Sequence, residues 1–516
     1  MRPTFMGFEV QKRTLQIAQK NIDITGNNVS NINTPGYTRQ RVDLYADYIS
    51  AQGDPNWTSK RSQLCMAGQG VNAYGVSQIR DQFIDKRYRE NVAVEAETET
   101  KVGILTDIED ILDNFESDGL QYYTQQFFNA LQDYSGKKPD SKDVAIICVN
   151  SAVNLCQLLN TYDTELKQVE DTYVAELQDT VDYVNKLLDE MNTLNQKIVK
   201  EKFHYPDEYG PNELNDQMNL YIDELATYGN IEVQHFNDGS YSIKMGGVTV
   251  LDGEANKTNR LIMKDYNNYG QAILGFESGH DLNLQSGSLK AYFDMINGNG
   301  VYATGHQNSE YGIAYFRSAI NEFARTIAKT FNEANGAEFD DFRKMFEPAT
   351  EDALITAGNI RVSKAWQEDP TMIGKVRKLD DETGLYVYGY DQKEQVINGK
   401  VTLQNTNVLY LISQFDNSNI KFGNAHDFEG SINEYISFIS NRLGQKIQYE
   451  SGRNDTAINT VDGLLDARDD ISAVQIDEEG INMLNYQKWY NASSRLVTAL
   501  DDLLDKLING TGRVGL

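Results

Sequence analysis

Apolar residues recur at helical spacing at both ends of the chain. In the first 40 residues, one row repeats at every seventh position and a second row lies beside it. The first row consists of Phe8, Leu15, Ile22 and Val29, and the second of Val10, Ile17 and Ile24. In the last 40 residues the steps alternate between three and four, with Ser493 as the one polar member: Met483, Tyr486, Tyr490, Val497, Leu500, Leu504 and Leu507. Each end is therefore predicted to be an amphipathic helix whose apolar seam suits a coiled-coil partner.

Neither terminal helix has a second helix close in sequence that could cover its seam. Burying about six large aliphatic side chains gives roughly 10–15 kcal/mol. Ordering about 30 residues costs roughly 1–2 kcal/mol per residue, only partly offset by helical hydrogen bonds. One seam alone is marginal, so we expect the two ends to pair as a coiled coil and to be buried among copies or neighbours. The alternative is that both helices fold onto the body of a monomer.

The interior pattern predicts long helices with smaller β-rich elements, an α+β fold that is mainly α. The longest helical pattern covers 144–203, and a helix of about 45 residues would extend ~68 Å, which favours an elongated helical bundle. Shorter helices are expected from about 83 and over 213–228, 313–335, 428–443 and 456–471. Alternating residues around Asn-Asp-Gly-Ser predict a hairpin over 231–243, and a second hairpin is expected between 385–390 and 395–403. Short strands are expected over 37–45 and 71–79.

This pattern divides the chain into three groups of segments. The terminal helices, 1–38 and 475–516, would form one coiled-coil domain. A helical body would comprise 39–230, 285–340 and 405–474, and short β-rich outer elements would comprise 231–284 and 341–404.

Charge and composition exclude several classes of partner. The 516 residues carry a formal net charge of −29, which disfavours binding to nucleic acid or to anionic membranes. No continuous run of about 18 apolar residues occurs, so membrane insertion is not expected. The N-terminus lacks the apolar core and small-residue cleavage site of a Sec signal. Cys148 and Cys156 lie eight positions apart, about 12 Å along a helix, too far to form a disulfide.

Candidate catalytic and metal-binding groups do not form a recognisable site. The five histidines are scattered without a His-Glu-x-x-His pair: His204, His235, His280, His306 and His426. The acidic pairs at 340–341, 380–381 and 469–470 read as solvated faces. No phosphate-binding loop occurs, and Gly68, Gly70 and Gly75 miss the dinucleotide spacing. We therefore expect no enzyme activity, no cofactor and no metal.

A distinctive motif covers 25–40, where the first helix ends. Asparagine side chains at a helix end can satisfy free backbone groups, and Pro-Gly fixes the direction in which the chain leaves. The candidate assembly residues in it are Asn27, Asn28, Asn31, Thr34, Pro35, Gly36, Tyr37 and Arg39. This stretch resembles the N-terminal signature of flagellar axial proteins, which are the rod, hook and hook-associated subunits. The C-terminal stretch that begins Ile476-Asp477-Glu478-Glu479 resembles their matching C-terminal signature.

Within these proteins the chain most resembles the hook-associated protein 1 (FlgK) family. The resemblance rests on Pro-Gly-Tyr-Thr-Arg-Gln at 35–40 and on three internal stretches, 68–84, 287–289 and 314–335. One departure is the short distance between Phe346 and Leu411, which indicates that the outer β domain of longer members is reduced or missing.

The resemblance implies a non-enzymatic structural subunit that joins the flagellar hook to the filament. Such a subunit would be secreted unfolded through the flagellar type III channel and would form a homo-oligomeric ring, with the terminal helices building the inner tube. Implied partners are the hook protein, hook-associated protein 3 and the export chaperone FlgN, which would bind the C-terminal seam. The alternatives are another axial subunit (hook protein or flagellin-like), a non-flagellar coiled-coil interaction protein and, last, a secreted enzyme.

Overall fold

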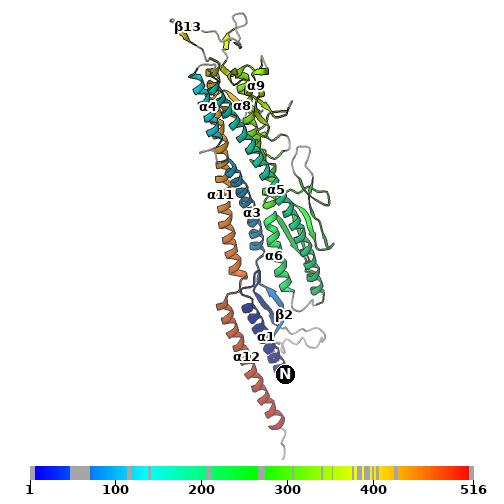
Figure 1. Cartoon of the computed structure of the whole chain (residues 1–516). Helices are drawn as coiled ribbons and strands as arrows, with labels where there is room; N and C mark the ends of the chain where they lie inside the picture. The colour runs from blue at the N-terminus through cyan, green and yellow to red at the C-terminus, as the bar shows by residue number, and fades with distance from the viewer. Residues whose placement is uncertain are drawn as a thin grey trace, which may run out of the picture. The chain divides into compact units, whose positions relative to one another are not determined.

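The fold is described by a computed structural model of the chain (Figure 1). The described residues are 6–46, 70–112, 119–137, 141–204, 211–264, 273–304, 307–338, 341–350, 353–374, 377–379, 386–388, 395–397, 400–402, 406–423 and 428–510. Contacts divide the chain into two compact units. Unit 1 comprises Met1–Ala93, Val184–Arg260 and Ala457–Leu516, and unit 2 comprises Val94–Tyr183 and Leu261–Thr456.

Three long helices contribute residues to both units. They are α3 (Gln82–Leu112), α5 (Lys142–His204) and α11 (Ile432–Ser472). The α5 bounds confirm the long helix predicted over 144–203, because its apolar positions keep one helical rhythm.

Unit 1 combines helices with two small antiparallel sheets. Its helices, besides parts of the long three, are α1 (Met6–Ser30), α6 (Asn212–Tyr228) and α12 (Ile476–Asp505), which continues as a π-helical turn over Lys506–Gly510. One sheet pairs β1 (Gln40–Ala46) with β2 (Val71–Gln78). The other has the order β3 (Ile231–His235), β4 (Tyr241–Met245), β5 (Val248–Asp252) and β6 (Lys257–Thr258). Its core contains Leu188, Met191, Ile222, Leu225 and Ile243, all fully buried.

Unit 2 is mainly helical around an aromatic core. It contains α4 (Leu120–Ser135), α7 (Ser288–Asn297), α8 (Ile313–Asn335), α9 (Lys364–Glu368) and α10 (Thr406–Ser413). Its strands form two-stranded antiparallel sheets: β7 (Leu261–Lys264) with β8 (Ile273–Phe276), β9 (Phe346–Pro348) with β10 (Ile360–Val362), β11 (Arg377–Leu379) with β12 (Tyr386–Tyr388), β13 (Gln395–Ile397) with β14 (Lys400–Thr402), and β15 (Ile420–Phe422) with β16 (Phe428–Gly430). The ring of Phe127 packs against those of Phe331, Phe346, Trp366 and Phe415.

The predicted fold class, mainly α with smaller β elements and paired terminal helices, is confirmed. The hairpin predicted over 231–243 is β3–β4, and Gly239 takes φ +91° in its turn. The helices predicted over 213–228 and 313–335 are α6 and α8.

Three sequence predictions differ from the structure. The helices expected over 428–443 and 456–471 are one helix, α11. The polar stretch between them stays helical because the buried Glu450 forms ion pairs with Lys446 and Arg453, each about one turn away on the same helix. Residues 428–430 are strand β16 instead. In the second hairpin region β12 pairs with β11, and β13 pairs with β14.

The third difference concerns the apolar character of α5. An 18-residue window of this helix has a mean hydropathy of 1.5, and by length and composition the helix could cross a membrane. Polar residues interrupt this window, so it contains no continuous apolar run of the length expected for a membrane-spanning helix. The same helix supplies Cys148, Leu155 and Leu159 to the core of unit 2, whereas its Ile146 and Ile147 are exposed.

Candidate assembly interface

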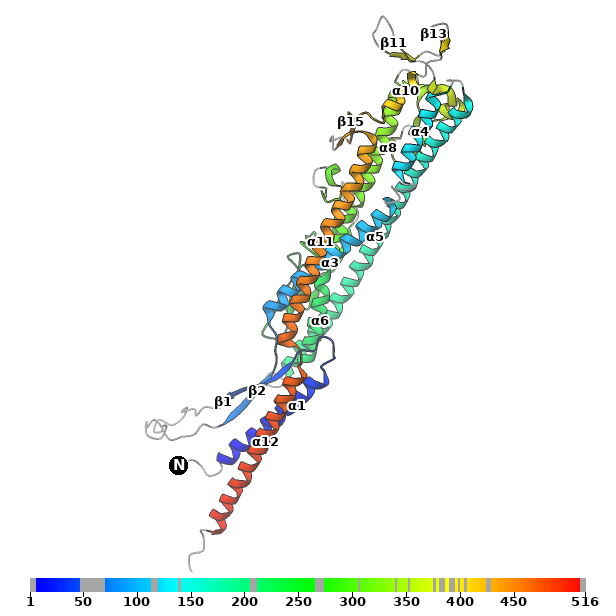
Figure 2. The same cartoon turned by 90° about the vertical axis from the view of Figure 1, so that its left-hand side faces the viewer.

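The two terminal helices, α1 and α12, pack along each other within unit 1 (Figure 2). A Cβ added at Gly7 would lie 3.3 Å from Cδ1 of Leu500, so the helices are in close contact there. Further along, Phe8 and Leu15 face Tyr490 and Val497 across a groove of about 350 Å³. The N-terminal and C-terminal seams identified in the sequence therefore lie opposite each other in one chain.

Burial along α1 does not simply follow its aliphatic seam. Phe8, Leu15, Ile22 and Val29 are all half-buried. The most buried residues form an adjacent line that is mostly small or polar: Ile17, Ala18, Asn21, Thr25 and Asn28. The seam residues therefore keep apolar surface that a further neighbour could cover.

The helix α12 is much more exposed than α1. Of its residues, Glu479 and Ser493 are buried. The seam residues Met483, Tyr486, Val497, Leu500 and Leu504 are half-buried, whereas Tyr490 and Leu507 are exposed.

A second apolar row on α12 was missed by the sequence reasoning. Ile481, Leu484, Leu496 and Leu503 are 61%, 58%, 51% and 63% exposed, and we call these four residues the outer stripe. Ala492 and Ala499 continue the same helical row between them. At 100° per residue this row lies about 120° around the helix from the seam. The signal was present in the sequence as a second set of three- and four-residue steps.

Asn28 is the centre of the Asn-rich motif. Its side-chain N–H donates to Gln40 O at 2.9 Å and to Glu479 Oε2 at 3.3 Å. Its side-chain oxygen accepts from Gln40 N at 3.0 Å and from the Tyr37 hydroxyl at 2.9 Å. Asn27 donates to that hydroxyl at 3.2 Å, and Asn31 donates to Asn27. The end of α1, the turn after it and the start of α12 are thus joined through one amide.

Arg39 makes the direct ionic link between the two terminal signatures. Its Nε lies 2.7 Å from Glu479 Oε1, and one of its terminal nitrogens lies 2.8 Å from Glu478 Oε2. Its backbone N–H donates to Ser472 O at 2.9 Å, at the end of α11. Burial opposes its charge, but the hydrogen bonds and charges of Glu478 and Glu479 raise the pKa of Arg39. We call Asn28, Arg39 and Glu479 the clasp.

The Pro-Gly turn is fitted against α6. Gly36 has φ +75°, and a Cβ there would lie 2.5 Å from Cγ of Leu220, so glycine is required both by conformation and by space. Two residues on, Thr38 N donates to Asp216 Oδ2 at 3.2 Å, and Gln78 donates to the other oxygen at 2.7 Å. Burial raises the pKa of Asp216, partly offset by the bonds from Thr38.

A chain of ion pairs around the buried Asp85 fixes the helix that leads into α12. Arg468 of α11 contacts Asp85 at 3.1 Å and Asp223 at 2.7 Å. Arg80 contacts Asp85 at 3.0 Å, and Arg89 contacts Asp223 at 2.6 Å. Burial opposes the charge of Asp85, but Arg80 and its neighbours hold the pKa of Asp85 below its usual value. This network ties α3, α6 and α11 together within unit 1.

The described part of the chain contains no group of three or more His, Cys, Asp or Glu that could hold a metal ion. His204 lies on α5, His235 on β3 and His280 in the loop between β8 and α7, whereas His306 and His426 fall outside the described residues. Burial raises the pKa of both Cys148 and Cys156 to about 12, so these thiols stay protonated. The interface is therefore built from packing, amide hydrogen bonds and ion pairs.

Family models match the regions that form this interface. One described as "Flagella basal body rod protein" matches residues 8–38, and one described as "Flagellar basal body rod FlgEFG protein C-terminal" matches residues 470–510. Together with the paired terminal helices, these matches place the chain in the class of flagellar axial proteins. A third model, "Flagellar hook-associated protein FlgK helical domain", matches residues 105–344.

Full-length relatives narrow the class. The "Flagellar hook-associated protein 1" of Bacillus subtilis is 30% identical over 550 residues, covering 99% of this chain and 99% of the relative. The proteins of that name from Salmonella typhimurium and Escherichia coli are each 22% identical, covering 96% of this chain and 98% of each relative. The chain belongs to the flagellar hook-associated protein 1 family, a family of structural flagellar proteins, which confirms the resemblance drawn from its motifs.

A solved structure agrees in fold. The flagellar hook junction protein FlgK from Burkholderia pseudomallei matches with a TM-score of 0.56 at 12% identity, covering 74% of this chain and 99% of that chain.

Proposed function

We propose that this chain is the subunit of a homo-oligomeric ring that joins the flagellar hook to the filament, and that it assembles through its terminal helices. The observation that best supports this proposal is the exposure of the outer stripe. The seam of α12 is already half-covered by α1, whereas Ile481, Leu484, Leu496 and Leu503 remain more than half exposed. Exposed apolar rows of this kind mark protein–protein contacts.

The free energy gained by burying the outer stripe is of the size expected for assembly onto a structure that already presents several contact surfaces. Covering four half-exposed aliphatic side chains gains roughly 1–2 kcal/mol each, about 4–8 kcal/mol in total. Association of two free molecules costs roughly 4–15 kcal/mol. The stripe alone would therefore not hold two free chains together, but it would contribute where several surfaces are engaged at once, as on a growing flagellum.

The site residues take separate roles in this proposal. Phe8, Leu15, Ile22 and Val29, together with the C-terminal seam residues, would form the paired inner-tube domain of 1–38 and 475–516. Asn28 and Arg39 would act from within the same chain, because their contacts hold the start of α12. Thr34 and Pro35 are exposed beside the turn and would be free to meet a neighbour.

The proposed partners follow from the family resemblance. They are further copies of the chain, the hook protein and hook-associated protein 3, with secretion through the flagellar type III channel to the hook–filament junction. The export chaperone FlgN would cover the α12 seam before export, when α1 has not yet folded against it. That seam and the outer stripe together would leave two apolar faces of α12 exposed in the unfolded chain.

The test is a pair of charges on the outer stripe. Leu496→Asp with Leu503→Asp should leave the folded monomer intact and should abolish incorporation, because two carboxylates would have to be buried between neighbours. The control, Ser494→Asp with Thr498→Asp, adds the same charges to exposed positions on another face of α12. Both are expressed in a deletion strain and scored by swimming, by microscopy of the hook–filament junction and by unpolymerised flagellin in the medium. Normal junctions with the stripe variant would contradict the proposal.

A further inference from the structure

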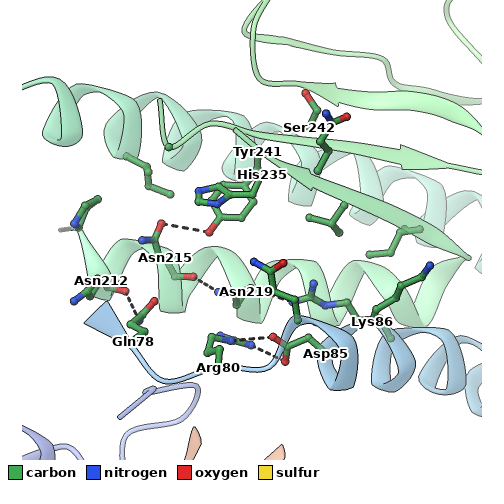
Figure 3. A pocket seen from close by; sticks show the side chains of 18 of the residues that line it. Gln78, Arg80, Asp85, Lys86, Asn212, Asn215, Asn219, His235, Tyr241 and Ser242 are labelled. Carbon is green, nitrogen blue, oxygen red and sulfur yellow. Dashed lines mark hydrogen bonds and ion pairs between the residues drawn. The ribbon is translucent and has the colours of Figure 1, made fainter. Parts of the chain in front are cut away.

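Unit 1 contains a second surface feature, an open groove of about 1050 Å³ between helices α3 and α6 and the β3–β4 hairpin. Figure 3 shows Asn215 bonded to Tyr241 on one side and Arg80 paired with Asp85 on the other. All five residues of β3, Ile231–His235, line the groove. Its volume is close to the upper end of the range for small-molecule sites.

The hydrogen-bond pattern shows which backbone groups of β3 face away from its sheet. In an antiparallel pair, alternate residues bond to the neighbouring strand. Gly246 N donates to Asn230 O, and Phe236 N donates to Ser240 O, so even-numbered positions point toward β4. The N–H and C=O groups of Ile231, Val233 and His235 therefore point outward. Among the described strands, none pairs with this edge.

The groove is also positively charged on a strongly acidic molecule. Five cationic residues line it, Arg80, Lys86, Arg89, Lys202 and Lys244, against two acidic residues, Asp85 and Glu232. The whole chain has 76 acidic and 47 basic residues.

Two lysines that make no close ion pair, Lys202 and Lys244, line the groove together with the open strand edge. Arg80, Arg89 and Lys86 are paired with Asp85, Asp223 and Glu90. Lys202 and Lys244 form no ion pair within 4 Å with any residue in the described ranges. Glu232 is the register partner of Lys244, and the charge of Lys202 acts on Asp238. Burial and the nearby charge of Lys202 lower the pKa of His235, the last residue of the β3 edge.

We propose that this groove binds an extended acidic segment of a second copy of the chain, which adds as a strand to the free edge of β3. An open strand edge gives main-chain hydrogen bonds to any extended segment. Charge then selects the occupant, because the surface of a copy is acidic and the groove is not. This inference rests on the proposed function, which brings copies side by side.

A photo-crosslink tests the identity of the occupant. Gln234, an exposed residue of β3 that lines the groove, is replaced by benzoyl-phenylalanine in the full chain, and assembled flagella are irradiated. We expect a product of twice the chain's mass, in which mass spectrometry finds Gln234 joined to an acidic peptide of the same protein. The absence of that product, or crosslinks to another protein alone, would overturn the proposal.

Charge reversal tests the electrostatic part. Lys202→Glu with Lys244→Glu should reduce the homodimeric crosslink by about tenfold, since attraction becomes repulsion. The control is Lys186→Glu with Lys197→Glu, at two exposed positions of α5 outside the groove. Equal crosslink yields from both double variants would rule out recognition by charge.

Proline substitution tests the strand edge. Val233→Pro removes an outward N–H and leaves the β4 ladder intact, so the protein should fold and lose the crosslink. Gln234→Pro removes an inward N–H and should lower the thermal transition instead. A Val233→Pro protein that folds and crosslinks like wild type would show that no strand is added.

These outcomes are separable from those of the proposed function. If the outer-stripe variant assembles normally, the proposed function fails, while the groove crosslink is still read in wild-type flagella. If assembly needs the outer stripe but the groove yields no homodimer, the groove proposal alone fails.

Discussion

At the scale of single residues, the clasp concentrates contacts on one buried carboxylate. The Glu479 side chain is 3% exposed and binds both Arg39 and Asn28, whereas Glu478 is 54% exposed and binds Arg39 only. The two neighbours therefore offer a matched pair of substitutions at one helix start.

Glu479→Gln should destabilise unit 1 by roughly 1.5–3 kcal/mol, because charge-assisted hydrogen bonds to Arg39 are weakened in a buried place. Glu478→Gln should cost less than about 1 kcal/mol, as exposed ion pairs do. The free energy of unfolding in urea measures both. Equal effects from the two substitutions would show that burial of Glu479 does not matter.

The Asp85 network predicts a dependence on pH. The folded pKa of Asp85 lies below 3.8, so its stabilisation is fully present above that pH and is lost as the pH falls through the folded pKa. Asp85→Asn should cost roughly 3–5 kcal/mol at pH 7, because Arg80 and Arg468 lose their carboxylate. The difference from wild type should shrink as the pH falls below 3.8 and through the folded pKa of Asp85.

The pKa of Asp216 is shifted in the opposite direction, so the experiment needs a control for this group. Its pKa is raised, so folding gains stability as the pH falls through the folded pKa of this group. The Asp85 contribution is therefore measured as the difference between wild type and Asp85→Asn, in which Asp216 cancels. A difference that stays constant from pH 7 to below the folded pKa of Asp85 would contradict the prediction.

Sequence patterns located the motif residues but not their partners. The 25–40 and 476–479 stretches were identified separately as signatures, yet the bonds of Asn28 and Arg39 to Glu479 cross more than 400 positions in the chain. Likewise, nothing in the spacing of Gly36 indicated Leu220 as its neighbour. Contacts of this kind depend on how distant segments meet, which periodicity does not encode.

At the scale of elements, α12 is a helix with two apolar faces that differ in how much of their surface the rest of the chain covers. One face is half-covered by α1, and the outer stripe has no cover within the described chain. Helices such as α5 and α8 were predictable because one continuous apolar face determines them. The break expected in α11 was wrong because Lys446, Glu450 and Arg453 satisfy one another along the helix.

Leu500→Asp separates the two faces of α12. Leu500 lies against Gly7, so a carboxylate there should weaken the α1–α12 pairing by roughly 1.5–3 kcal/mol. We expect incorporation and chaperone binding to be lost, while the main thermal transition by circular dichroism stays nearly unchanged. A large drop in that transition would place the seam in the core of the folded body.

At the scale of the whole molecule, burial is unevenly shared. The largest fully buried side chains include Trp366, Phe127, Phe331 and Tyr435, all in unit 2, whereas α12 in unit 1 contributes two buried residues. Regions with few buried apolar contacts open locally at low free-energy cost.

Brief proteolysis of the purified monomer should therefore remove 475–516 and then 1–40 before the body is cut. Mass spectrometry of timed samples gives the order of cleavage, and the Glu479→Gln protein should be trimmed faster than wild type. If both ends resisted as long as the 155–199 part of α5, the terminal helices would be complete without partners.

The fit of Gly36 against Leu220 has a consequence for inheritance. Because the turn requires a residue without a side chain, a substitution of Gly36 would be tolerated only if the backbone around it rearranged. Position 220 is not so limited on its own, yet a bulkier branched residue there would press on the Pro-Gly turn. Proteins that descend from this one should therefore keep glycine at position 36, and substitutions of Leu220 should be limited to residues of similar or smaller side-chain volume.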